Sequence, residues 1–269
     1  MSLFEQVGRP LVVWAQDVGA VTLQWWTAIR ALPSVMPVVG KRRRWRAVLE
    51  QALAIGVRAL PMASVMSLCL GFVLALQSAA ELRRFGGINF VVDLVAVTFT
   101  RELGALITAI AVSGRSASAI SAEVGTMVVT EEMDALRVMG LNPAEFTLAP
   151  KYLGALIAMP CLTILSTVCG IFAGYVFMAF SVDMDFRVYF RQAFEAILVR
   201  DIWLTLIKSV VFATIIVQVG YLNGLRVSGG PAAVGRATTR AVVESTFLVI
   251  VADLAATWFF YTMGWSAAG

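Results

Sequence analysis

Five long stretches of the chain carry apolar side chains almost without interruption. They cover about residues 54–80, 90–114, 149–179, 202–221 and 242–264. A run of about 18 or more apolar residues is long enough to cross the hydrocarbon core of a bilayer as a helix. Polar and apolar positions do not alternate within these stretches, as they do in the strands of a membrane barrel. The pattern therefore predicts an all-α polytopic membrane protein with five transmembrane helices.

The first 40 residues have a different pattern. Apolar side chains recur at roughly helical spacing from Leu3 to Trp26, and polar residues such as Asp17 interrupt them. The basic cluster at residues 41–46 follows this part, whereas in a signal peptide it would precede the apolar region. An amphipathic helix that lies in the membrane interface fits this pattern. We therefore divide the chain into an interfacial helix at 1–40 and a five-helix transmembrane domain at 41–269.

Lysine and arginine residues between the apolar stretches and near their ends predict the orientation. One side would carry Arg9, Arg30, Lys41, Arg42, Arg43, Arg44, Arg46, Arg58, Arg115, Arg137, Lys151, Arg226, Arg236 and Arg240, and the other only Arg83, Arg84, Arg187, Arg191 and Arg200. The positive-inside rule places the more basic side in the cytoplasm. The N-terminus and a segment at 115–146 are then cytoplasmic, and the C-terminus is outside. Residues 181–200 are expected to form an amphipathic helix outside, and the Gly-rich stretch 228–241 a cytoplasmic loop.

Composition excludes several classes of function. The chain is 59% hydrophobic and only 14% charged, against about 25% charged in soluble domains. It has no histidine, which removes histidine-based zinc sites and nucleophile pairs. The three cysteines lie in apolar stretches, where buried thiols pack as small hydrophobes. No Gly-x-x-x-x-Gly-Lys-Ser/Thr motif occurs. We expect no catalytic residue, metal, cofactor or nucleic-acid partner, and no ATPase site in this chain.

Two adjacent charges interrupt the second apolar stretch, in the sequence VTFTRELGALITAI at 97–110. On a helical wheel of 100° per residue, small residues such as Gly104 and Ala105 lie beside Arg101, and Glu102 also avoids the bulky face. Both charges should therefore point into the protein rather than at acyl chains. A charge at the centre of a spanning helix costs roughly 2.5–3.5 kcal/mol on insertion scales, so partners are expected.

The candidate partners are Lys208 in the fourth stretch and Asp253 in the fifth. One interpretation is an interhelical ion-pair network of these two residues with Arg101 and Glu102. The other is that Arg101 and Lys208 present positive charge to an anionic headgroup while Glu102 holds them in place. A guanidinium suits phosphate because it donates two parallel hydrogen bonds. Helical periodicity does not rank the two interpretations.

Three separated blocks carry a family resemblance. They read TRELGALITAIAVSGRSASAISAEVGTMVVTEEMDALRVMGLNP at 100–143, IKSVVFA at 207–213 and GRATTRAVV at 235–243. Together they resemble the MlaE (YrbE) permease family, the membrane subunits of lipid-transporting cassette systems that work with MCE-domain proteins. Within the first block, DALRVMG at 134–140 is similar to the coupling loop of ATP-binding-cassette importer permeases. One departure is RELGAL, where the family often has RELGPV.

The resemblance implies an architecture and partners. A homodimer of the permease would have five spanning helices and an interfacial helix in each copy. Two separate ATPase chains, which bind the ATP and magnesium, would dock beneath it, often with a STAS-domain subunit, and an MCE-domain protein would sit on the outer side. The coupling helix would include Glu131, Glu132, Asp134, Arg137 and Gly140. The lipid cavity would include Arg101, Glu102 and Lys208, and we expect Leu74, Gln77 and Leu103 beside it.

These observations predict a permease that moves lipid, with phospholipid favoured, between the inner membrane and the MCE partner. The alternative is an ion- or proton-coupled secondary transporter or channel that uses Glu102 and Asp253, since carboxylates within a membrane often mark ion pathways. Lipid identity, the direction of transport and the charge that touches the headgroup do not follow from the sequence.

Overall fold

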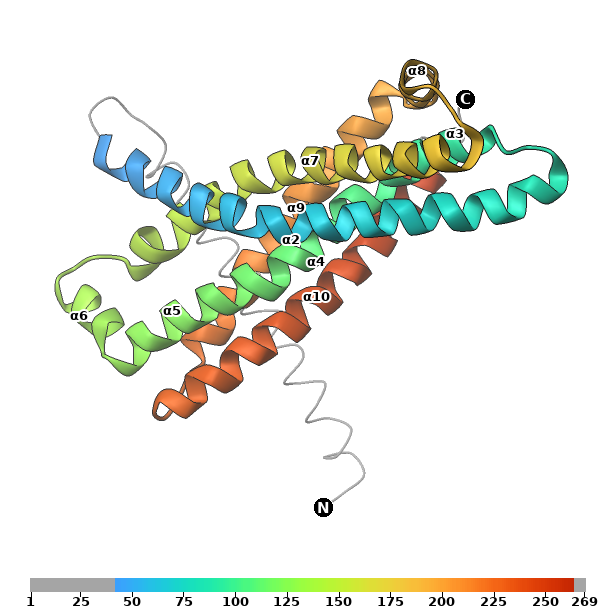
Figure 1. The fold of residues 1–269 in the computed structure, drawn as a ribbon. Coiled ribbons are helices and arrows are strands. Elements are labelled where there is room, and N and C mark those ends of the chain that lie inside the picture. Colours follow the sequence, from blue (N-terminus) through green and yellow to red (C-terminus); the bar gives the residue numbers. More distant parts are fainter. Residues whose placement is uncertain (1–41, 264–269) are drawn as a thin grey trace.

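The computed structural model describes residues 42–263, and in this range every regular element is a helix (Figure 1). The interfacial helix expected at 1–40 lies outside the described residues. In chain order the elements are α2 (Arg42–Leu82), η1 (Arg83–Phe85), α3 (Phe90–Thr98), η2 (Phe99–Leu103), α4 (Gly104–Val112), η3 (Ser113–Ala117), α5 (Ser118–Val129), α6 (Glu132–Val138), η4 (Ala144–Leu148), α7 (Ala149–Val182), α8 (Phe186–Ala196), α9 (Val199–Leu225) and α10 (Pro231–Thr262). The elements η2, η3 and η4 are π-helical turns.

The five predicted spanning helices are confirmed. The helices long and apolar enough to cross a membrane are Trp45–Phe85, Phe90–Val129, Phe146–Val182, Val199–Leu225 and Pro231–Thr262. Each is longer than its apolar stretch. The second runs without a break through α3, η2, α4, η3 and α5, and therefore includes the first half of the segment expected at 115–146.

The prediction of a loop at 228–241 is wrong, because α10 already begins at Pro231. Proline suits the first turn of a helix, where its missing N–H is not needed. Only residues 226–230 separate α9 from α10, and Gly229 there has a φ of +100°, which favours glycine. The small residues after Pro231 therefore form a helix surface and not a loop.

Helices α2 and α7 lie side by side along much of their length (Figure 1). They approach closely because small residues face each other: a Cβ on Gly71 would meet the carbonyl of Gly170, and one on Gly154 would lie 2.8 Å from the backbone nitrogen of Ala52. Close backbone approach through small residues is the usual way in which helices associate within a membrane. The α2–α7 pair forms one side of the bundle.

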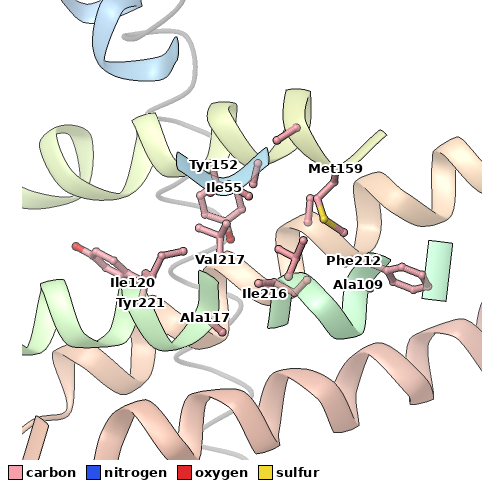
Figure 2. Close-up of a cluster of buried hydrophobic side chains, with 14 of the residues drawn as sticks. Ile55, Ala109, Ala117, Ile120, Tyr152, Met159, Phe212, Ile216, Val217 and Tyr221 are labelled. Carbon is pink, nitrogen blue, oxygen red and sulfur yellow. The ribbon is translucent and has the colours of Figure 1, made fainter. Parts of the chain in front are cut away.

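The main core lies between this pair and helices α4, α5 and α9 (Figure 2). Met159 of α7 and Phe212 of α9 are fully buried there, and the hydroxyl of Tyr152 donates a hydrogen bond to the Gln218 side chain. Leaving either the Tyr152 phenol or the Gln218 amide without a hydrogen-bond partner in this core would cost free energy. Their hydrogen bond therefore fixes the relative depth of α7 and α9.

The amphipathic helix expected within 181–200 is confirmed as α8. The Asp185 carboxylate caps its first turn by accepting from the backbone N–H of Arg187 at 3.0 Å. On its inner face Tyr189 is buried and donates to the carbonyl of Ile171 at 3.1 Å. Burial raises the pKa of the Tyr189 phenol, so the phenol keeps the proton that it donates. Helix α8 is thereby held across the end of α7.

We predict that Gly71→Ala destabilises the protein by about 1–3 kcal/mol, because the new methyl group would overlap the backbone of α7. The measurement is thermal unfolding of the purified full chain in detergent. Gly235→Ala in α10 is the control, since a Cβ there meets nothing within 4 Å and alanine is the better helix former. Equal unfolding temperatures for the two variants would contradict the close packing of α2 and α7.

Candidate functional site

Arg101 and Glu102 lie in the π turn η2, in the first half of the second spanning helix, Phe90–Val129. A π turn interrupts the regular hydrogen-bond ladder of an α-helix and is frequent at functional sites. The turn also changes the direction in which the side chains after it point around the helix axis, relative to the side chains before it. Val92 and Phe99 are fully buried, whereas Leu103 at the end of the turn is partly exposed.

Side chains of α9 bind the backbone of this turn. The hydroxyl of Thr205 donates to the carbonyl of Thr100, and the Lys208 ammonium lies 3.5 Å from the carbonyl of Arg101. Carbonyls released from a regular ladder need other donors within a membrane, where no bulk water is available. Helix α9 supplies them, and so stabilises η2.

Lys208 joins three elements through its ammonium group. Its Nζ forms a close ion pair with Glu102 of η2, lies 3.0 Å from Oδ1 of Asp253 in α10 and donates to the Thr257 hydroxyl at 2.8 Å. The Lys208 side chain is only 1% exposed, whereas that of Glu102 is 34% exposed. The network that the sequence suggested is therefore present around Lys208, with Thr257 as an additional member that was not predicted.

Arg101 has a different partner from those considered in the sequence. Its Nε lies 3.0 Å from Oδ1 of Asp201, a fully buried carboxylate at the start of α9. Asp201 immediately precedes the apolar stretch at 202–221 and was not among the partners considered from the sequence. One feature of the sequence could have identified Asp201 as part of the site. It lies seven residues, or two helical turns, before Lys208, and this spacing puts both residues on one face of α9.

A small cavity of about 40 Å³ opens between these groups. It is lined by Arg101, Glu102, Asp201, Leu204, Lys208, Thr257 and Phe260. Together with Asp253, the site has two cationic and three carboxylate side chains, so its formal charge is negative. Of the charged groups on its wall, Arg101 and Glu102 are the most accessible, at 29% and 34%. The cavity has room for about one water molecule.

The remaining residues expected at the lipid site lie elsewhere. Leu74 of α2 and Leu103 of η2 pack against the second hydrophobic cluster, which contains Phe99, and Gln77 is exposed on α2. None of these three lines the charged cavity. The structure thus brings Arg101, Glu102 and Lys208 together and leaves the other three outside that cavity.

The residues expected to couple to an ATPase lie together at the other end of the molecule, around α6 (Figure 1). We call residues 131–140 the acidic segment. Its charged side chains are exposed, Met133 anchors it in the core, and Arg137 pairs with Asp134 at 2.8 Å. Glu131 has a φ of +59° and Gly140 one of +73°, so left-handed residues mark both ends of the segment. An exposed helical turn held at both ends is a suitable docking surface.

An ion pair that the sequence did not suggest links α5 to α7 near this segment. Lys151 Nζ lies 2.6 Å from Glu123 Oε1, and the lysine side chain is buried. Sequence reasoning counted Lys151 only as a topology signal. Its pairing connects the helix that leads into the acidic segment with the next spanning helix.

These features define a polytopic helical membrane protein with a charged site within its spans and an exposed acidic helix at one end. The chain belongs to the MlaE permease family, since the model described as Permease MlaE matches residues 48–259. A "Probable ABC transporter permease protein" of Rickettsia prowazekii is 32% identical over 95% of this chain and 96% of its own.

Two further relatives come from photosynthetic organisms. The chloroplastic protein TRIGALACTOSYLDIACYLGLYCEROL 1 of Arabidopsis thaliana is 31% identical over 84% of this chain and 65% of its own. A "Probable ABC transporter permease protein" of Synechocystis is 30% identical over 80% of this chain and 82% of its own. The protein is thus a permease subunit of the ATP-binding-cassette class, and the secondary-transporter alternative gives way to it.

Replacing Lys208 tests whether its ammonium group holds the helices around the charged site together. We expect Lys208→Met to destabilise the full chain by about 3–5 kcal/mol, because two carboxylates are left facing each other without a cation. The measurement is again thermal unfolding in detergent. Arg191→Met is the matched control, since its pair with Glu195 at 2.9 Å is exposed on α8, and an exposed pair screened by solvent contributes little to stability. Similar losses in the two variants would show that Lys208 does not hold the helices together.

Proposed function

We propose that the protein is the permease of an ATP-driven lipid transporter that moves phospholipid between the membrane and a partner outside. The observation that carries this proposal is the charged site within the spans, where Arg101 and Glu102 remain accessible beside a buried Lys208. Charged groups inside a membrane are costly and commonly mark a substrate pathway. The Arabidopsis relative bears the name of a glycolipid, which agrees with a lipid substrate.

The charged side chains of the site have different roles in this proposal. Arg101 meets the phosphate of the lipid, because a guanidinium has five N–H donors in a fork that matches phosphate oxygens. Lys208 is compensated by Glu102 and Asp253 and positions Glu102 rather than meeting the lipid. Glu102 then faces the amine of a zwitterionic headgroup. A site with more carboxylates than cations suits such a headgroup better than a purely anionic one.

A second copy of the chain completes the lipid site in this proposal. The charged cavity of about 40 Å³ holds no lipid by itself, whereas a space between two copies would. Helix α10 leaves an apolar surface exposed that includes Phe247, Leu254 and Trp258. We propose that α10 and the accessible faces of α2 and η2 meet their counterparts there, with Leu74, Gln77 and Leu103 toward the acyl chains.

ATP hydrolysis on two separate chains would act through the acidic segment, with Glu131, Glu132, Asp134 and Arg137 facing the ATPase and Gly140 ending the turn. The helix Phe90–Val129 connects this end to η2 and is 40 residues, or about 60 Å, long. A push on α6 therefore reaches Arg101 through one continuous element. Transport then requires that the two positions of that element differ in affinity for lipid.

The proposed setting follows from the basic residues. The end with α6 lies in the cytoplasm of a cell with an inner membrane, and the N-terminus lies on the same side. The end with α8 faces outward, where an MCE-domain protein would receive or deliver the lipid. A STAS-domain subunit would accompany the ATPases.

Lipid binding to Arg101 can be tested by co-purification. We expect Arg101→Gln to retain about tenfold less phosphatidylethanolamine than the unaltered chain, the factor expected for loss of a charge-assisted hydrogen bond. Bound lipid is measured by mass spectrometry of the complex. Arg84→Gln is the control, because Arg84 is exposed beside Glu81 and does not line the charged cavity. Equal lipid content in both variants, with intact assembly, would refute the role of Arg101.

Docking of the ATPase can be tested at the acidic segment. We expect Asp134→Lys to lower the amount of ATPase that co-purifies by about tenfold or more, because it reverses a charge on the proposed contact surface. Glu195→Lys is a matched control: both carboxylates are exposed and pair with an arginine, at 2.8 Å for Asp134 and 2.9 Å for Glu195. Only Asp134 lies on the α6 end. Normal ATPase recovery with Asp134→Lys would contradict the coupling role.

A further inference from the structure

Arg58 of α2 and Arg115 of η3 meet where these two elements come into contact. The Arg115 guanidinium donates from Nη1 to the main-chain carbonyl of Arg58 at 2.7 Å. Pro61 lies inside α2, three residues further on, and lacks the N–H that would bind the carbonyl of Val57, so the helix ladder is interrupted beside this contact. The hydrogen bond holds the Arg115 side chain against α2, and both arginines are exposed there.

Neither of these two arginines has a carboxylate partner among the described residues. The nearest carboxylates along the two helices are Glu50 and Glu123, each eight residues, or about 12 Å, away. Both of these are paired already, Glu50 with Arg46 and Glu123 with Lys151. Two cations held close together without a counter-charge repel each other, so this part of the surface favours an anion that comes from outside the chain.

The position of the two arginines along their helices indicates which anion is available. Residues 59–80 of α2 carry no charge and extend over about 33 Å as a helix, close to the roughly 30 Å hydrocarbon core of a bilayer. Arg58 directly precedes this run. Arg115 directly follows residues 103–114, which are also uncharged. Both guanidinium groups therefore lie at the edge of the hydrocarbon, where the phosphate groups of lipids are the abundant anions.

The surface of α2 next to Arg58 becomes apolar toward the middle of the span. Met62 and Val65 lie one and two turns further along on the same face, and they are 50% and 59% exposed. A Cβ added to Gly114 would meet nothing within 4 Å, so the surface of η3 beside Arg115 is open as well. A phosphate at the arginines would thus leave its acyl chain along Met62 and Val65.

We propose that Arg58 and Arg115 form a binding site for the headgroup of an anionic phospholipid, whose phosphate accepts hydrogen bonds from both guanidinium groups. The planar fork of a guanidinium matches phosphate oxygens, and basic pockets between spanning helices bind anionic headgroups. Two cations without a carboxylate would repel the ammonium group of a zwitterionic lipid. The site therefore selects a headgroup with a net negative charge, such as that of phosphatidylglycerol.

This site is separate from the charged cavity, which neither Arg58 nor Arg115 lines. It also differs in chemistry, because carboxylates outnumber cations in the charged cavity. The inference does not rest on the proposed transport function, since it requires only that the chain spans a membrane.

The test compares the binding of two lipids by native mass spectrometry of the full chain, delipidated in detergent. Phosphatidylglycerol and phosphatidylethanolamine with the same acyl chains are added in steps. We expect the unaltered chain to bind phosphatidylglycerol about tenfold or more tightly than phosphatidylethanolamine, the factor that a hydrogen bond to a charged group provides. Arg58→Gln should remove most of this preference and leave the binding of phosphatidylethanolamine unchanged.

Arg58→Gln should also leave the fold unchanged, because within residues 42–263 the contact with Arg115 uses the main-chain carbonyl and not the Arg58 side chain. The double variant Arg58→Gln/Arg115→Gln should bind the two lipids equally. Arg187→Gln is the matched control. Arg187 is likewise exposed and forms no ion pair with a described residue, but it lies on α8 at the other end of the spans.

A second measurement locates the bound lipid. The full chain is placed in vesicles of phosphatidylethanolamine that contain a phosphatidylglycerol with a photoreactive diazirine at the start of one acyl chain. After illumination, labelled peptides are identified by mass spectrometry. We expect labels at residues 57–65, and we expect the double variant to lose them. Inorganic phosphate in large excess should not displace the label, because a free ion gains nothing from the apolar surface of α2.

Four outcomes would overturn the proposal. Equal affinities of the unaltered chain for the two lipids would show that the arginines do not select an anion. Equal losses in Arg58→Gln and Arg187→Gln would attribute the preference to net charge. A label at 57–65 that persists in the double variant would mean that the arginines do not hold the headgroup. Displacement by inorganic phosphate would make this a site for the free ion. Transport activity enters none of these measurements, so loss of the proposed function would leave the result intact.

Discussion

The buried ammonium group of Lys208 is the constraint on which the central arrangement depends. A lysine within a membrane-spanning helix must find carboxylates, and those available here come from two other elements, Glu102 in η2 and Asp253 in α10. Satisfying one cation with two different elements fixes both the rotation and the depth of α9 relative to them. Thr257 strengthens the arrangement by contacting the ammonium group and the Glu102 carboxylate together.

The π turn η2 gives three consecutive residues three separate roles. Thr100 lines a second, uncharged cavity, whose wall also includes Thr163 of α7, Arg101 pairs with Asp201, and Glu102 pairs with Lys208. A regular helix would separate consecutive side chains by 100°, but it would leave no carbonyl for the side chains of α9 to bind. The interrupted ladder therefore joins the second and fourth spanning helices through the backbone as well as through charge.

Local patterns were sufficient to predict much of this fold. The five spans and α8 follow from apolar length and amphipathic spacing, which depend only on neighbouring residues. Lys208 and Asp253 were identified as partners because few charges lie within the spans. The beginning of α10 was missed because a Gly-rich composition indicates a loop, whereas Pro231 begins a helix.

The pairings that were missed depend on tertiary contacts. Nothing in the sequence distinguishes Asp201, at the end of an apolar stretch, from a solvated carboxylate, until α9 is packed against η2. The helical wheel could not reveal the π turn either, because it assumes a constant 100° per residue. The contact of Arg115 with the carbonyl of Arg58 was equally hidden, since both residues counted only toward the orientation.

The shared wall between the two cavities has a mechanical consequence. Residues of η2 and of the first two turns of α9 line both, with Thr205 on the uncharged side and Leu204 on the charged side. A rotation of η2 that opened the charged cavity would therefore move Thr100 relative to Thr163. If a ligand in one cavity rotated η2, it would change the free energy of opening the other cavity, and by thermodynamic linkage the effect would be reciprocal. Because η2 is continuous with α5, displacement of the acidic segment would act on both cavities at once.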